Sequence, residues 1–187
     1  MTQRALIVID LQNDYFPGGK WPLNGIVAAA AKAARLLGAA RTAGDLVIHV
    51  RHETLRPGAA FFVPGTQGAA IHPSLAPRDG ETVVLKHFIN AFRDTGLKRL
   101  LDDAGATELT ICGAMSHWCI DAAVRAAADH GYVVTVIHDA CATRDLEFDG
   151  IKVPAAQVHA AFMAAISQGY ATAQSTDAYL AAGAAAA

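Results

Sequence analysis

The sequence predicts an α/β fold with three layers, α/β/α, around a parallel sheet. Short runs of apolar, largely β-branched residues alternate with longer segments of helical periodicity along the 187 residues. This alternation is typical of βαβ units, whose crossover helices cover both faces of a sheet. No internal repeat and no linker-like change of composition interrupts the pattern. We therefore predict a single domain over residues 1–187.

The first predicted strand is RALIVID (4–10), which is short, apolar and rich in β-branched residues. A helix follows over 24–44, with Asn24 near its start and Gly44 as its stop. The further predicted strands are 45–51, 81–87, 106–114, 132–140 and a weak sixth at 170–176. The further helices are 95–105, a segment that begins near Ser116, and 154–168. The terminal AAGAAAA, residues 181–187, is expected to fray.

The composition of the chain limits the kinds of molecule that the protein is expected to bind. The chain is 53% hydrophobic, 17% charged and carries a net charge of −2, so disorder is not expected and no basic surface for nucleic acid is indicated. No apolar run is long enough to span a membrane, and the N-terminus lacks a signal-peptide pattern. Three cysteines without CxxC spacing favour reduced thiols in a cytoplasm. We expect a cytoplasmic protein whose partner is a small molecule, with no nucleic acid and no membrane.

Three chemically useful residues fall at the ends of predicted strands. Asp10 ends the first strand, Lys86 ends the third, and Cys119 follows the fourth in the first turn of a helix. Ligands of such sheets bind outside the carboxyl ends of the strands. Singly, these residues have plainer interpretations: a capping aspartate, a surface lysine and a small buried cysteine. Their convergence on one edge instead indicates a site.

These residue types suit nucleophilic catalysis. If Ser116 caps the helix, Cys119 is its third residue, where the positive helix end and a nearby lysine favour the thiolate. Asp10 would take the thiol proton and later give it to a leaving amine. Unpaired N–H groups of the same turn would hold a developing oxyanion.

An ordered set of motifs carries a family resemblance. VIDLQNDY, a lysine that ends a strand before NAF, and GAMSHWC at a helix start resemble the isochorismatase-like cysteine hydrolase superfamily from about Ala5 to Tyr170. The resemblance implies six parallel strands in the order 3-2-1-4-5-6 and a catalytic triad of Asp10, Lys86 and Cys119. It also implies a non-proline cis peptide at Ala114–Met115, with the N–H groups of Met115 and Cys119 as an oxyanion hole, and a homo-oligomer, either a dimer or a tetramer.

The same resemblance bears on metals. Nicotinamidases of this superfamily carry a metal-binding Asp-x-His after the second strand, where this chain has His52 and Thr54. His72 lies in a long loop, 52–80, and is expected to organise it. We therefore expect no metal and no cofactor.

Several residues are candidates for contact with a substrate. His117 and Trp118 adjoin Cys119, and the aromatic residues before the first helix suit a substrate wall; the full set is Tyr15, Phe16, Trp21, His117 and Trp118. Phe61, Phe62 and Trp21 suit a pocket wall or a subunit interface equally. Cys112 is expected to be inert packing, and Cys141 lies after the fifth strand.

The sequence thus predicts a cysteine-dependent amidohydrolase that cleaves a small amide, ureido or lactam C–N bond through a thioester. Two alternatives stay open. One is an isochorismatase-type vinyl-ether hydrolase, a class that lacks the nucleophilic cysteine. The other is a non-catalytic oligomeric scaffold or binding protein on the same fold.

Overall fold

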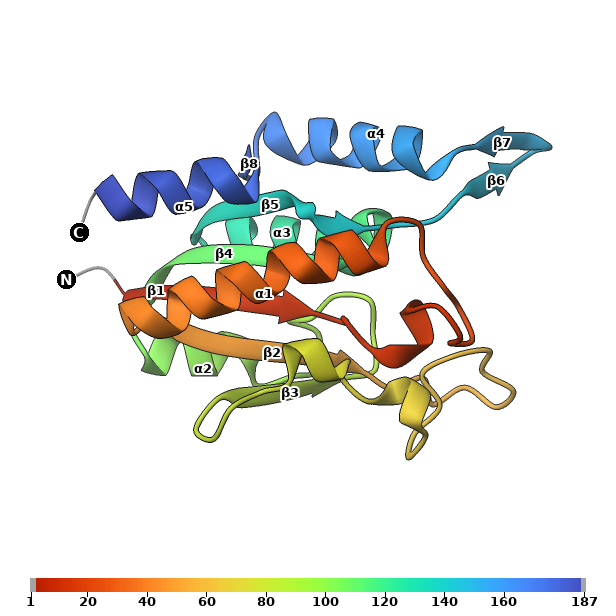
Figure 1. Cartoon of the computed structure of the whole chain (residues 1–187), viewed down its shortest axis with the longest axis horizontal. Helices are drawn as coiled ribbons and strands as arrows, with labels where there is room; N and C mark the ends of the chain where they lie inside the picture. Colours follow the sequence, from red (N-terminus) through yellow and green to blue (C-terminus); the bar gives the residue numbers. More distant parts are fainter. Residues whose placement is uncertain (1–2, 186–187) are drawn as a thin grey trace.

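A six-stranded parallel sheet forms the centre of the molecule. The computed structural model describes residues 3–185, and its sheet has the order β3-β2-β1-β4-β5-β8 (Figure 1). The strands are β1 (Gln3–Ile9), β2 (Leu46–His52), β3 (Thr82–Lys86), β4 (Ala106–Ala114), β5 (Val133–Ala142) and β8 (Thr172–Gln174). The predicted fold class and strand order are confirmed, with β8 as the sixth strand.

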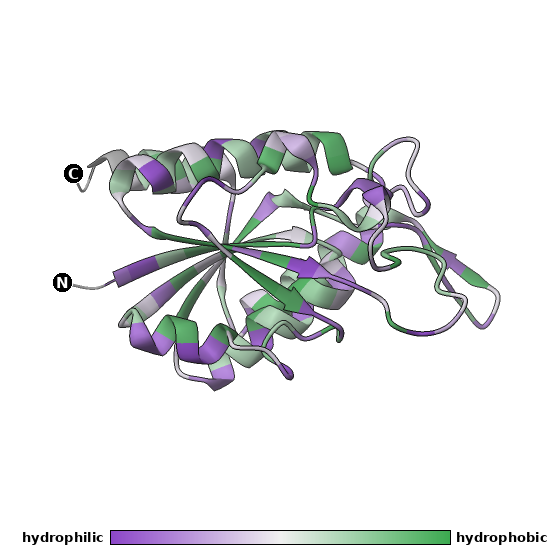
Figure 2. Cartoon of the chain, turned by 90° about the horizontal axis from the view of Figure 1, so that it is seen from below, coloured by the Kyte–Doolittle hydropathy of each residue, from purple (hydrophilic) through white to green (hydrophobic). Residues whose placement is uncertain are grey.

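Helices cover both faces of this sheet (Figure 2). The core on one face includes residues of α1 (Ile26–Ala43), and α5 (Thr176–Ala185) packs against it. The core on the other face includes residues of α2 (Leu97–Asp103), α3 (Asp121–Asp129) and α4 (Ala155–Ser167). The central strands read as continuous apolar runs because both of their faces are buried.

Local chemistry explains how the first βα unit begins and ends. Residues Ala5 to Ile9 of β1 are all buried, which suits a central strand between two helix layers. Helix α1 ends at Gly44, whose φ of 73° is left-handed and costs a glycine little. The predicted helix 24–44 is therefore confirmed, although it begins two residues later, at Ile26.

Two features differ from the sequence prediction. A two-stranded hairpin, β6 (Leu146–Phe148) and β7 (Ile151–Val153), projects from the body where no strand is predicted (Figure 1). Residues 181–185 continue helix α5 instead of fraying, while 186 and 187 lie outside the described residues. Alanine is the strongest helix former, and the helix start is held by Thr176, whose N–H and Oγ1 both donate to Asp139 Oδ1 at 2.7 Å.

Among residues 3–185, no helix combines the length and the apolar character needed to cross a membrane.

Candidate active site

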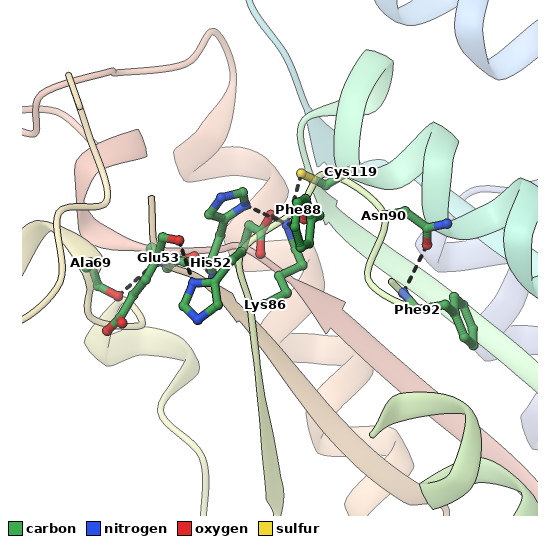
Figure 3. Close-up of polar contacts among 11 residues, drawn as sticks. His52, Glu53, Ala69, Lys86, Phe88, Asn90, Phe92 and Cys119 are labelled. Carbon is green, nitrogen blue, oxygen red and sulfur yellow. Dashed lines mark hydrogen bonds and ion pairs between the residues drawn. The ribbon is translucent and has the colours of Figure 1, made fainter. Parts of the chain in front are cut away.

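Side chains from three separate strand ends meet at the carboxyl edge of the sheet. Lys86 Nζ lies 2.8 Å from Asp10 Oδ2 and donates a hydrogen bond to Cys119 Sγ at 3.3 Å (Figure 3). The exposed fractions of Asp10, Lys86 and Cys119 are 0%, 1% and 1%. The structure therefore brings together the acid, the cation and the thiol that the sequence singles out.

The backbone at this edge is unusually constrained. Asp10 follows β1 directly with a left-handed φ of 52°, a conformation held by its N–H bond to the Val50 carbonyl at 2.9 Å. Gly113, near the end of β4, has no room for a side chain, because a β-carbon there would collide with the Ile9 carbonyl oxygen. Such positions persist only where the surroundings fix them, and they cluster at functional sites.

The Lys86 ammonium is the centre of the site's charge. Besides Asp10 and Cys119, it bonds to His52 Nδ1 at 2.8 Å and to the Phe88 carbonyl oxygen at 3.1 Å. Burial by itself would lower the pKa of Lys86, but Asp10 and Cys119 outweigh burial and raise it. The ammonium is therefore charged and is surrounded by acceptors.

The surroundings of Cys119 favour the neutral thiol, whereas the sequence analysis weighs only the helix start and the lysine, which favour the thiolate. Burial first, and the Asp10 carboxylate second, raise the pKa of Cys119 well above its usual range, while Lys86 acts in the opposite direction. Asp10 Oδ1 is buried and has no hydrogen-bond partner among the described residues. The site therefore holds a neutral thiol beside an available carboxylate oxygen.

The turn that carries Cys119 is a π-helical segment, Ser116–Ile120, between β4 and α3. Its N-cap is Met115 rather than the predicted Ser116, and the Met115 carbonyl accepts from Trp118 N–H and Ile120 N–H. The Ala114–Met115 peptide bond is cis, at the position that the resemblance implies. Within residues 3–185 the Met115 N–H donates no hydrogen bond.

Ser116 anchors this turn to the rest of the fold. Its Oγ lies 2.8 Å from His159 Nδ1 on α4 and donates to the Ala142 carbonyl oxygen at 3.3 Å. The turn is thus tied to both α4 and the end of β5.

Sequence reasoning missed two residues of the site. His52, the last residue of β2, is treated there only as a lost metal ligand, yet its ring bonds Lys86. Gln12 is not considered, although its Oε1 accepts from His52 N–H and its Nε2 donates to the His52 and Ala69 carbonyls, each at 2.8 Å. The strand-end rule that selects Lys86 would also have selected His52, which faces it in the β2–β3 register.

The aromatic candidates near the first strand form a packed cluster. Tyr15 lies 4.5 Å from Phe62 and 5.7 Å from Phe61 between ring centroids, and Trp21 stacks on Phe61 at 4.9 Å. Tyr15 is buried, and burial raises its pKa, with the nearby Asp10 carboxylate acting in the same direction. Phe16 is buried and stacks on His72 at 3.8 Å. Their contact with a substrate stays a prediction.

The candidates next to the cysteine are more accessible. His117 is half-buried, and its Nδ1 lies 2.6 Å from Thr143 Oγ1. Trp118 is 39% exposed. The other two cysteines, Cys112 and Cys141, are buried and unbridged, and burial raises the pKa of each.

A cavity of about 380 Å³ opens beside the triad. Its lining includes His52 and Phe88, both of which bond Lys86 Nζ, and Ala122, which lies one helical turn after Cys119. The remaining lining residues are His87, Ile89, Asn90 and Arg93. None of the predicted wall residues lines this cavity; Trp21 lines a different hollow with Arg144.

One group of side chains has the spacing of a metal site. Ligand atoms of Asp10, His52 and Cys119 all lie within 4.8 Å of one another. Lys86 Nζ forms an ion pair with Asp10 and hydrogen bonds with His52 and Cys119, so its ammonium takes the place that a cation would need. His72 and Thr54 do not belong to this group.

Comparisons with known proteins agree with this architecture. The isochorismatase domain model matches residues 4–178. A crystal structure of a putative isochorismatase hydrolase from Oleispira antarctica superimposes with a TM-score of 0.93 at 58% identity, covering 96% of this chain and 97% of that one. The isochorismatase family protein YddQ of Bacillus subtilis is 51% identical over 94% of this chain and 98% of its own length.

A more distant relative has a named activity. The maleamate amidohydrolase of Pseudomonas putida is 32% identical over 75% of this chain and 72% of its own length. With a family match across nearly the whole sheet and its helices, the chain belongs to the isochorismatase family of hydrolases.

Proposed function

We propose that the protein is a cysteine-dependent amidohydrolase that cleaves a small amide, ureido or lactam C–N bond through a thioester. The observation that carries this proposal is the buried Lys86 ammonium, which lies against both Asp10 and Cys119. An acid–base group and a thiol joined by one cation are the parts that acyl transfer to sulfur requires. The maleamate amidohydrolase among the relatives supports the same class of reaction.

Acylation begins with a neutral thiol. As the substrate carbonyl carbon approaches Cys119, the thiol proton passes to Asp10 Oδ1 and sulfur attacks the carbon. The former carbonyl oxygen becomes an oxyanion, which the N–H groups of Met115 and Cys119 would hold. Lys86 stays charged throughout and stabilises whichever neighbour, Asp10 or Cys119, carries the negative charge.

Collapse of this tetrahedral intermediate breaks the C–N bond. Asp10 returns its proton to the nitrogen, so that an amine or ammonia leaves, or the ring of a lactam opens with its amine still attached, and a thioester remains on Cys119. A water molecule then gives a proton to Asp10 and attacks the thioester. The carboxylic or carbamic acid is released, and Cys119 regains its proton.

The alternatives are weaker on specific grounds. A vinyl-ether hydrolase has no use for a thiol bonded to a buried ammonium, which this site contains. A scaffold has no use for a charged lysine buried at 1% exposure, because burying a charge is costly without a function or a partner that needs it. Homo-oligomerisation, a cytoplasmic location and the substrate roles of Tyr15, Phe16, Trp21, His117 and Trp118 stay predictions.

A substrate screen with an acyl-trapping step tests the proposal. Small carboxamides, ureido compounds and lactams are assayed for amine or ammonia release, and hydroxylamine is added to intercept the thioester as a hydroxamate. We expect turnover and hydroxamate formation in the wild type, and neither in Cys119→Ala. Undiminished hydrolysis by Cys119→Ala would refute the proposal.

A further inference from the structure

The ring of His52 is fixed in one protonation state by its partner. An ammonium has three donors and no acceptor, so in the 2.8 Å bond between Lys86 Nζ and His52 Nδ1 the imidazole nitrogen must accept. A nitrogen that accepts carries no proton, so the neutral ring carries its proton on Nε2. Burial and the Lys86 charge lower the pKa of His52 to about 4, in agreement with a neutral ring.

The Nε2–H group is the polar group of His52 that is free to bind a ligand. The backbone N–H and C=O of His52 both bond Gln12, and Nδ1 bonds Lys86. His52 nevertheless lines the cavity, so the ring edge with Nε2 is its free polar part. Among residues 3–185, the ring of His52 makes its hydrogen bond through Nδ1, to Lys86, and none through Nε2. Figure 3 shows the ring beside Lys86 and close to Cys119.

The other polar groups of the cavity are also mainly donors. Asn90 Oδ1 accepts from Phe92 N–H at 2.9 Å, which leaves the Asn90 amide N–H groups unused by that bond. The Arg93 guanidinium stacks over the Phe88 ring at 3.8 Å and adds a positive charge. Its ion pair with Asp94, at 3.7 Å, joins two exposed groups and is therefore weak.

Acceptors are scarce in the same lining. None of the lining residues in the described chain carries a carboxylate, and the one ring acceptor that His87 offers is Nε2, because its Nδ1 donates to the Glu53 carbonyl oxygen. A cavity with apolar walls, several donors and a cation complements a ligand group that only accepts hydrogen bonds.

We infer that the protein acts on a substrate with a carboxylate a few atoms from its scissile carbonyl, and that His52 Nε2–H binds this carboxylate, with Asn90 and Arg93 as further donors. The inference rests on the proposed function, because Cys119 defines the place of the scissile carbonyl. The short reach follows from the position of the ring: one nitrogen of His52 lies within 4.8 Å of Cys119 Sγ, and Nε2 belongs to that same five-membered ring.

Two alkylating agents test this inference without knowledge of the substrate. Iodoacetate and iodoacetamide deliver the same carbon to sulfur, but only iodoacetate carries a carboxylate. The rate constant of each at Cys119 is measured by mass spectrometry, and the ratio of iodoacetate to iodoacetamide is compared between variants. A change in the ionisation of the thiol, or in how easily a reagent reaches it, alters both rate constants by a similar factor. Such a change therefore cancels in their ratio.

The decisive variant is His52→Asn. Asparagine places an oxygen near the position of Nδ1, which still accepts from Lys86, but it has no donor at the position of Nε2. We expect the ratio to fall about tenfold, the effect of one hydrogen bond to a charged group. Arg93→Gln should lower the ratio in the same direction. The matched control Arg99→Gln removes an exposed arginine from α2 and should leave the ratio unchanged.

The outcomes separate this inference from the proposed function. An unchanged ratio in His52→Asn, with Cys119 still labelled, would overturn the role of His52 and leave the cysteine mechanism standing. Failure of both reagents to label Cys119 in the wild type would overturn the nucleophile and this inference with it.

Discussion

Replacement of Lys86 by methionine tests how the buried site is held together. Methionine keeps most of the side-chain length and removes the charge, so Asp10 is left without the ammonium 2.8 Å from its Oδ2. Removing one partner of a buried ion pair costs about 3–5 kcal/mol, because the remaining charge is uncompensated. We expect that loss in the free energy of unfolding near pH 8, and a fall in turnover of about 10²–10⁴-fold.

A second substitution separates charge from packing. Asp10→Asn removes the uncompensated charge, and asparagine tolerates the left-handed backbone at this position. Lys86→Met with Asp10→Asn should therefore be more stable than Lys86→Met alone, although both are inactive.

Urea unfolding followed by tryptophan fluorescence, together with turnover measurements, gives both quantities. Lys98→Met is the matched control, because Lys98 pairs with Asp102 on the exposed surface of α2 and should change neither quantity appreciably. Wild-type stability in Lys86→Met, or a double variant no more stable than the single one, would refute the charge argument.

Three further predictions concern the thiols, metals and pH. Brief substoichiometric iodoacetamide should label Cys119 ahead of Cys112 and Cys141, as peptide mass spectrometry would show; equal labelling would contradict the assignment. Dialysis against EDTA should leave turnover unchanged, since Lys86 occupies the cation position; loss of turnover restored by zinc, iron or manganese would contradict this. The hydrogen bond from Arg41 lowers the pKa of Glu81 to about 2, so its stabilising effect is present above the unfolded pKa and lost as pH falls toward 2. Glu81→Gln should therefore lose less stability than the wild type between pH 5 and pH 2, in unfolding curves across that range.

The sequence was sufficient to predict the sheet and the meeting of three residues. Apolar runs such as residues 4–10 have few alternatives to buried strands, and parallel strands deliver their last residues to one edge. Asp10, Lys86 and Cys119 therefore converge whatever the details of the loops. The hairpin at 146–153 was missed because its strands have only three residues each, too few for a visible alternation.

The protonation state of the site could not be read from the sequence in the same way. Helix position and a nearby lysine both favour a thiolate at Cys119, and both are visible in the motif. Burial is not visible there, and it is the largest influence on the pKa of this thiol. His52 was missed for a related reason. It belongs to the site because its ring bonds Lys86 on the neighbouring strand, and a comparison with metal ligands does not suggest that bond.

A raised pKa at Cys119 is compatible with nucleophilic catalysis because the site conserves its charge. At rest, the Asp10 carboxylate and the Lys86 ammonium cancel, and the thiol is neutral. Ionisation of the thiol to solvent would leave a net negative charge in a buried site, which is costly. Transfer of the same proton to Asp10 leaves a thiolate, a neutral carboxyl and the ammonium, again with no net charge. The high pKa describes the first process, whereas the proposed attack on a substrate uses the second, so the proposed mechanism needs Asp10 and Lys86 together.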